Sequence, residues 1–174
     1  MDVMKIASLS VLACLVMAAV LEDFSRMKIS NRLILTGIGL GLLLQIQSGG
    51  AEHIIRILAN ILFPVILLYL LFLAGILGAG DIKLFSMIGA YCATFKTLCH
   101  CILFSFIAGG VYAFFRLLKE KRLTEALSQG ISYLFCLAAG NRTPYPGQEA
   151  HQKMHFSAAI AVGLAAALIG ENLL

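Results

Sequence analysis

The sequence predicts an all-α integral membrane protein with about six transmembrane helices. Hydrophobic residues make up 60% of the 174 residues and charged residues only 13%, and the mean hydropathy is +0.94. A soluble domain is nearer about half apolar and about a quarter charged. The apolar residues also gather into runs long enough to form spanning helices. A water-soluble fold could not bury this much apolar surface, so we expect a single transmembrane domain over residues 1–174.

The apolar runs set the predicted spans. A spanning helix needs about 20 apolar residues at a rise of about 1.5 Å each. The first run has no A-x-A before the LEDF that follows it, so we interpret it as a retained span and not as a cleaved signal peptide. Short runs are tolerated where helices pack on one another or meet a water-filled cleft. The predicted spans cover about 3–21, 32–47, 54–77, 82–96, 98–118 and 155–172.

One long connection, residues 119–153, separates the last two predicted spans and is expected in the cytoplasm. Its first part, about 119–140, is predicted to be amphipathic. It either lies on the membrane surface or docks a cytoplasmic partner, and both alternatives stay open.

The basic residues predict the sidedness, because cytoplasmic loops are enriched in Lys and Arg. With the N-terminus and the C-terminus outside, only Lys5, Arg56 and Lys96 lie on the outer side. The inner side then holds Arg26, Lys28, Arg32, Lys83, Arg116, Lys119, Lys121, Arg122, Arg142 and Lys153. In this topology Asp23 follows span one and Asp81 follows span three, so both acids face the cytoplasm.

The cysteine and histidine spacings do not indicate a metal or a cofactor. The five cysteines form no CxxC pair and are predicted to be packing residues. His151 and His155 stand at i, i+4, but no third ligand has a suitable spacing. We therefore expect no metal, no cofactor and no nucleic-acid partner.

The two aspartates carry the chemistry that the sequence offers. The chain contains no GxSxG, HExxH or Walker loop. Two carboxyl groups brought to roughly 3 Å share a proton, so that one acts as general base on a water while the other polarises a carbonyl. Asp23 and Asp81 are the candidate catalytic residues. The alternative is that Asp81 is only an N-cap residue and Asp23 a solvated charge.

Small residues are predicted to shape the site and the helix packing. Gly78 and Gly80 are expected to let a peptide backbone approach, in torsions closed to other residues. Two stripes of small residues suit close helix packing, although small residues also simply abound in membrane helices: Gly37 with Gly41, and Ala159 with Gly163 and Ala167.

Two motifs together resemble the type IV prepilin peptidase family, the GxGD membrane aspartyl proteases. That family shows an Asp followed six residues later by Ile-Pro-Asn, and further on GxGD-x-K. KMHFSAAIAVGLA also resembles its final helix. Ser30 and His155 stand where the family usually has proline, and Ser30 is expected to loosen the turn into span two. The matching residues are Asp23, Ile29, Asn31, Gly78, Gly80, Asp81 and Lys83.

The resemblance implies an aspartyl endopeptidase of the inner membrane that removes prepilin leader peptides at the cytoplasmic face, with Asp23 and Asp81 as its catalytic acids. It points to the short branch that serves Tad/Flp-type pili, without N-methyltransferase activity. The implied partners are prepilin or pilin-like substrates, membrane lipid and other pilus-assembly proteins.

Several alternatives remain open. An archaeal-type preflagellin peptidase has the same chemistry. A small proton-coupled transporter or channel subunit would also place acids at membrane depth, but we see no inverted repeat. A structural assembly protein is a third possibility. Lys83 either steadies the charge of Asp81 or snorkels to the headgroups, and Glu22 is expected to be solvated.

Overall fold

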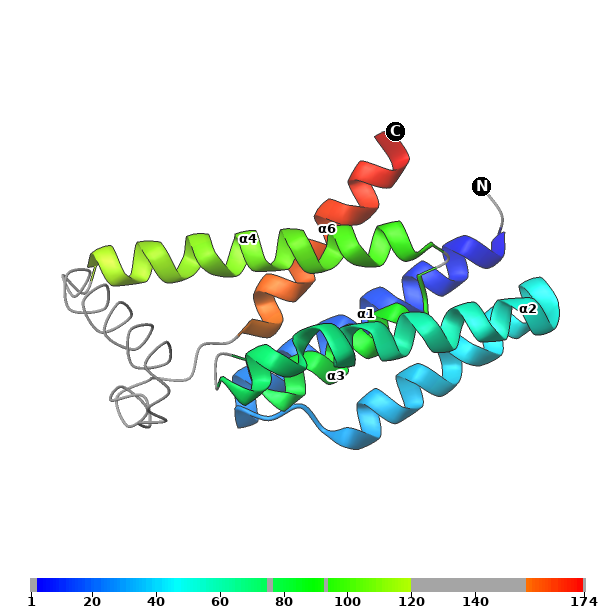
Figure 1. The fold of residues 1–174 in the computed structure, drawn as a ribbon, viewed down its shortest axis with the longest axis horizontal. Coiled ribbons are helices and arrows are strands. Elements are labelled where there is room, and N and C mark those ends of the chain that lie inside the picture. The colour runs from blue at the N-terminus through cyan, green and yellow to red at the C-terminus, as the bar shows by residue number, and fades with distance from the viewer. Residues whose placement is uncertain (1–2, 75–76, 93, 120–155, 174) are drawn as a thin grey trace. The chain divides into compact units, whose positions relative to one another are not determined.

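The structure, a computed structural model, describes residues 3–74, 77–92, 94–119 and 156–173. In these residues the chain is helical and contains no strand, which confirms the predicted all-α class (Figure 1). Residues 120–153 of the predicted cytoplasmic loop lie outside the described residues, as do His151 and His155. The described helices are α1 (Val3–Arg26), α2 (Asn31–Leu73), α3 (Ala79–Gly89), α4 (Phe95–Lys119) and α6 (Phe156–Leu173).

The chain divides into two compact units. Unit 1 comprises Met1–Ala108 and His155–Leu174, and unit 2 comprises Gly109–Met154. The described part of unit 2 is the last part of α4, where Phe114 and Phe115 are exposed and their ring centroids lie 6.2 Å apart. The candidate catalytic residues belong to unit 1.

Three helices in the described part of the chain are long and apolar enough to cross a membrane: Ile6–Arg26, Ile54–Leu73 and Phe95–Arg116. They match the first, third and fifth predicted spans. Two shorter apolar helices, Asn31–Ile46 and Phe156–Gly170, match the second and sixth. The count of six spans and the outside location of both termini stay predictions.

Helix α2 folds back on itself, although it is helical over all 43 residues. Gly41 meets Ala90 and Tyr91, while Asn60 bonds the carbonyl of Cys92. Positions 41 and 60 of a straight helix would be about 28 Å apart at 1.5 Å per residue, so both can reach the end of α3 only if the helix reverses. Figure 1 shows this reversal at one end of α2. The chain therefore has two limbs here, 31–46 and 54–73, as two separate predicted spans require.

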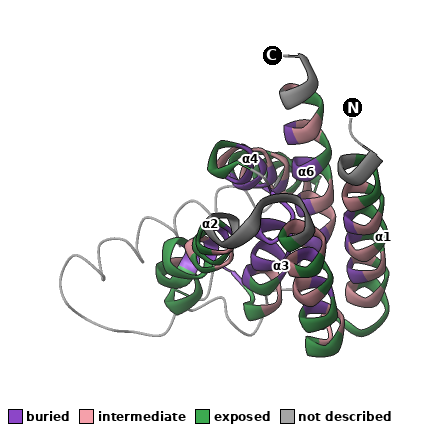
Figure 2. Cartoon of the chain, turned by 90° about the vertical axis from the view of Figure 1, so that its right-hand side faces the viewer, coloured by how far each residue is buried: buried purple, intermediate pink, exposed green. Residues whose placement is uncertain are grey.

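Helix α3 is the central element of unit 1. Its residues Ile82 and Leu84–Gly89 are buried, and α1, α2 and α6 all pack against it. Figure 2 shows the buried positions gathered on α3 and on the faces that these helices turn toward it. The apolar faces that point away remain exposed, as expected of helices whose solvent is lipid.

The predicted fourth span, 82–96, is wrong in its extent. The helix begins earlier, at Ala79, and ends at Gly89 after 11 residues, a length of about 16 Å. Beyond its end, Gln45 Nε2 donates to the Tyr91 carbonyl at 3.1 Å and Asn60 Nδ2 to the Cys92 carbonyl at 3.0 Å. Side chains from the two limbs of α2 thus satisfy carbonyls that a longer helix would have used internally. The next helix, α4, starts at Phe95.

The small-residue stripes permit close backbone contacts, which confirms their predicted role at three glycines. A Cβ on Gly163 would overlap Ser105 of α4. A Cβ on Gly37 would overlap the Met87 side chain of α3, and one on Gly41 would lie 3.0 Å from that of Ala90. Contacts this short exclude any larger residue unless a neighbour moves.

Candidate active site

Asp23 lies in the last turn of α1, which ends at Arg26. The helix stops because Met27 adopts a left-handed conformation with φ 54°, and its N–H donates to the Asp23 carbonyl oxygen at 2.8 Å. This left-handed residue after the last helical turn is a common helix stop, although glycine is the usual residue there. The Asp23 side chain is half-buried, so this turn fixes the carboxyl at the end of a candidate span.

The turn from α1 into α2 is held by two hydrogen bonds. The Ser30 N–H donates to Glu22 Oε2 at 2.9 Å, and the Leu33 N–H donates to Ser30 Oγ at 3.3 Å, so Ser30 caps α2. The predictions that Glu22 is solvated and that Ser30 loosens this turn are both wrong. A proline here could adopt the observed φ of −72°, but it would supply neither the N–H nor the capping oxygen.

Asp81 lies in the first turn of α3, before the predicted span. Its Oδ2 accepts a hydrogen bond from the Gly78 N–H at 3.2 Å, so the predicted alternative of a helix-capping role is part of what the residue does. Burial raises the pKa of Asp81 to about 6, the Gly78 bond opposes this rise, and the negative charge of Asp23 adds to it. The structure thus brings the two aspartates close enough for one charge to act on the other.

The two glycines of the motif do not adopt the unusual torsions that were predicted. Gly78 has φ −78° and ψ 149°, values open to any residue, and Gly80, the second residue of α3, is in an ordinary helical conformation. What distinguishes them is space. A Cβ on exposed Gly78 would lie 3.1 Å from Asp81 Oδ2, whereas one on Gly80 would lie 3.6 Å from Ile29 Cδ1. The absence of a side chain at Gly78 leaves the Asp81 carboxyl uncovered on that side.

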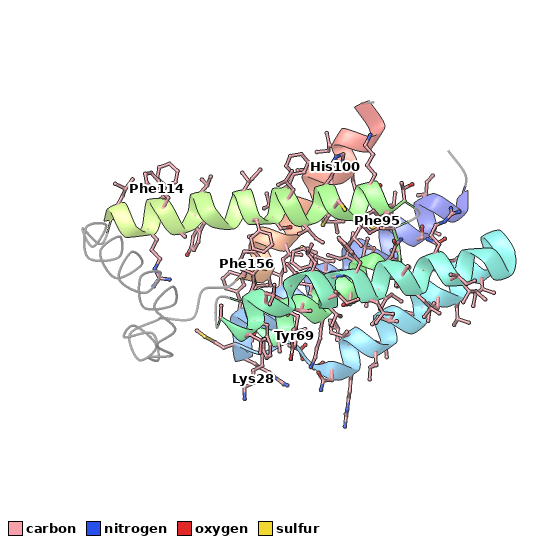
Figure 3. All side chains as sticks on the ribbon, viewed as in Figure 1. Lys28, Tyr69, Phe95, His100, Phe114 and Phe156 are labelled. Carbon is pink, nitrogen blue, oxygen red and sulfur yellow. The ribbon has the colours of Figure 1, made fainter. Side chains whose placement is uncertain are left out.

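The supporting residues of the two motifs contact each other. Lys83 Nζ donates to Asn31 Oδ1 at 2.8 Å, and Ile29 packs beside Gly80. The bond of Lys83 to Asn31 differs from both predicted roles of this lysine, because it ties the start of α2 to the second turn of α3. Lys28, by contrast, is exposed and projects outward from the turn after α1 (Figure 3).

Ser157 is a site residue that the sequence analysis missed. It is the second residue of α6 and is completely buried, and its Oγ donates to Asp23 Oδ2 at 2.6 Å. Ser157 is also the one polar residue of the apolar run from Phe156 to Ile169. A lone hydroxyl in such a run could have drawn attention, but its partner, 134 residues away, could not have been named.

Among the described residues, no group of three or more His, Cys, Asp or Glu side chains is placed to hold a metal ion. The two carboxyl groups have different surroundings. Asp23 is half-buried beside a serine hydroxyl, and Asp81 has a pKa raised toward neutrality.

Comparisons with known proteins identify the family. A search of curated proteins and a search of solved structures return no match. The model of the type IV leader peptidase family matches residues 10–114, which include both aspartates and every supporting residue of the two motifs but not Ser157. With this match over more than half of its length, and with helices suited to a bilayer, the chain belongs to the type IV leader peptidase family of membrane proteases.

Proposed function

We propose that this protein is a membrane-embedded aspartyl endopeptidase that removes the leader peptide of prepilins at the cytoplasmic face of the inner membrane. One observation carries the proposal: Asp23 at the end of α1 and Asp81 at the start of α3 interact electrostatically at one end of unit 1. Both acids also lie within the residues that match a leader peptidase family.

The proposed reaction uses the two carboxyl groups in opposite protonation states. Asp23 is the ionised general base: it takes a proton from a water whose oxygen attacks the carbonyl carbon of the scissile peptide bond. Asp81 enters protonated and gives its proton to the carbonyl oxygen, which forms a tetrahedral intermediate. When the C–N bond breaks, the leaving amine takes the proton from Asp23. One of the two hydroxyls of the intermediate returns a proton to Asp81 as the carbonyl forms again.

The uncovered side of Asp81 supports binding of an extended peptide. Gly78 is exposed and has no side chain to stand between a substrate and the Asp81 carboxyl. The peptide bonds of a helix are hydrogen-bonded and shielded, so a protease needs its substrate extended at the bond to be cut. We propose that the leader junction lies against residues 78–80 in this form.

The sidedness and the substrate class extend the proposal. The excess of basic residues on one side favours a cytoplasmic active site, and exposed Arg26, Lys28 and Arg32 suit contact with anionic lipid headgroups. The 174 residues contain no CxxC pair, so we propose peptidase activity on Tad/Flp-type prepilins without N-methyl transfer. Pilus-assembly proteins are the proposed further partners.

Leader cleavage tests the proposal. A Flp-type prepilin and, separately, an archaeal preflagellin would be co-expressed with the wild type, Asp23→Asn or Asp81→Asn, and the products sequenced from the N-terminus. We expect cleavage of the prepilin by the wild type and a loss of at least about a hundredfold in each variant, since positioned acid–base groups contribute about that much or more.

Glu22→Gln is the matched control, because it removes an adjacent negative charge while its amide oxygen can still accept the Ser30 N–H. It is expected to retain cleavage. If both aspartate variants still cut the prepilin, the catalytic assignment is wrong. Cleavage of the preflagellin alone would move the substrate to that class. If no version cuts either protein while proton flux depends on the acids, the transporter alternative replaces the protease.

A further inference from the structure

We propose that Ser157 is a positioning residue that orients the Asp23 carboxyl as the general base. This inference rests on the proposed function and deepens it, because it names the group that aims one of the two acids. Ser157 lies on α6, outside the residues matched to the family.

The geometry of the hydrogen bond supports a directed role. Ser157 Oγ lies 2.6 Å from Asp23 Oδ2, a short distance of the kind found when a hydroxyl donates to a carboxylate. Ser157 is completely buried, so water cannot easily take the place of either partner.

The packing of α6 holds the hydroxyl in place. Phe156 packs against Phe106 of α4 with ring centroids 5.6 Å apart, and Gly163 lies directly against Ser105. Helix α6 also packs against α1. A serine near the start of a helix commonly bonds to its own backbone, whereas this one donates across to another helix.

The two acids accept hydrogen bonds from different kinds of group. From Phe156 to Gly170, α6 carries no ionisable side chain, so on this side the hydroxyl is the polar group. Asp81 accepts a backbone N–H instead, at the longer distance of 3.2 Å. The charged side chains on α1, the turn, α2 and α3 at this end are Glu22, Arg26, Lys28, Arg32, Asp81 and Lys83.

The test observes the hydrogen bond of Asp23 directly. The full protein in lipid nanodiscs would be examined by infrared spectroscopy at fixed pH, with Asp23→Asn used to assign the carboxyl band of Asp23. We expect Ser157→Ala to shift the frequency of this band, because it removes the hydroxyl that donates to Asp23 Oδ2. Ser105→Ala is the matched control. It removes another buried hydroxyl, one that donates within its own helix to Cys101, and it should leave the band unchanged.

The kinetics of leader cleavage are the second readout. Ser157→Ala should lower kcat about tenfold and leave KM unchanged, because one hydrogen bond to a charged group holds the base in position. Ser157→Thr, which keeps a hydroxyl, should retain most of the rate. An unchanged Asp23 band in Ser157→Ala overturns the inference, and so does an unchanged kcat. If the wild type cuts no prepilin, the proposed function fails, while the infrared band still decides whether Ser157 holds Asp23.

Discussion

The two ends of α3 differ in the kind of polar group they carry and in how those groups are hydrogen-bonded. Just beyond its C-terminal end the Tyr91 hydroxyl donates to the Gly37 carbonyl at 2.9 Å, and Gln45 and Asn60 donate to the carbonyls of Tyr91 and Cys92. Each of these groups has one defined partner and lies in or beside the core. At the N-terminal end two half-buried carboxyl groups interact electrostatically, and that of Asp81 has a raised pKa. One end fixes the helix, and the other keeps groups that can exchange protons.

This difference explains why so short a helix can carry the site. An 11-residue helix alone would be marginal, and it cannot span a bilayer about 30 Å thick. Both limbs of α2 hold the C-terminal end of α3 in place. The N-terminal end can therefore keep two interacting carboxyl groups at a small cost in the stability of the fold. The comparison predicts that substitutions at the anchored end change stability, and that substitutions at the aspartate end change chemistry.

The largest effect on stability is expected from Gly89→Ala at the anchored end. A Cβ on Gly89 would overlap the backbone carbonyl of Asn60, which cannot rotate away, so the two helices must separate. We expect a loss of about 2 kcal/mol in the free energy of unfolding, measured by denaturation in detergent micelles.

The matched control for Gly89→Ala is Gly39→Ala, because a Cβ there meets nothing within 4 Å. It should be neutral or stabilising, since alanine favours a helix over glycine by about 1 kcal/mol. Equal stability of the two variants would contradict the close packing at Gly89.

A smaller effect, dependent on pH, is expected from Asp81→Asn. The pKa of Asp81 is raised from 3.8 to about 6 by burial, so the folded protein binds its proton more tightly than the unfolded chain. This contribution to stability is fully present below 3.8 and is lost as the pH rises through about 6. Asp81→Asn, which has no such proton, should therefore melt higher than the wild type above that range. A difference in melting temperature that does not vary with pH would contradict the raised pKa.

A roughly tenfold loss of cleavage is expected from Gly78→Ala, because displacing a catalytic group by a fraction of an ångström is costly. Its Cβ would lie 3.1 Å from Asp81 Oδ2 and push the carboxyl away. Gly80→Ala is the control, since its Cβ would make ordinary contacts with Ile29 at 3.6 Å and beyond. The assay is the rate of prepilin cleavage at equal amounts of inserted protein. A greater loss in Gly80→Ala would refute this explanation of the motif.

The smallest effect is expected from Met27→Gly in the turn after α1. Met27 has φ 54°, a conformation that costs a residue with a side chain about 1 kcal/mol or more. Glycine removes this strain, so the variant should unfold at a slightly higher temperature and cut prepilin at the wild-type rate. A lower unfolding temperature would show that the Met27 side chain contributes more than the strain costs.

Much of the site could be predicted because it depends on local patterns. Asp23 and Asp81 were expected on one side since two spans separate them, and in the structure the charge of Asp23 acts on Asp81. The end of α3 could not be predicted, because the apolar run continues to Tyr91 and Cys92 while Gln45 and Asn60 stop the helix through distant contacts. Ser157 was missed for the same reason. Its function depends on a contact that only the folded chain creates.

The most direct test of the paired aspartates is the titration of Asp81 with and without the charge of Asp23. The protonated carboxyl of Asp81 would be followed by infrared spectroscopy in the wild type and in Asp23→Asn. We predict a pKa of about 6 in the wild type and a lower one in Asp23→Asn, because the charge that helps to raise it is gone. The same pKa in both proteins would show that the two acids do not interact, and the paired-aspartate account would be wrong.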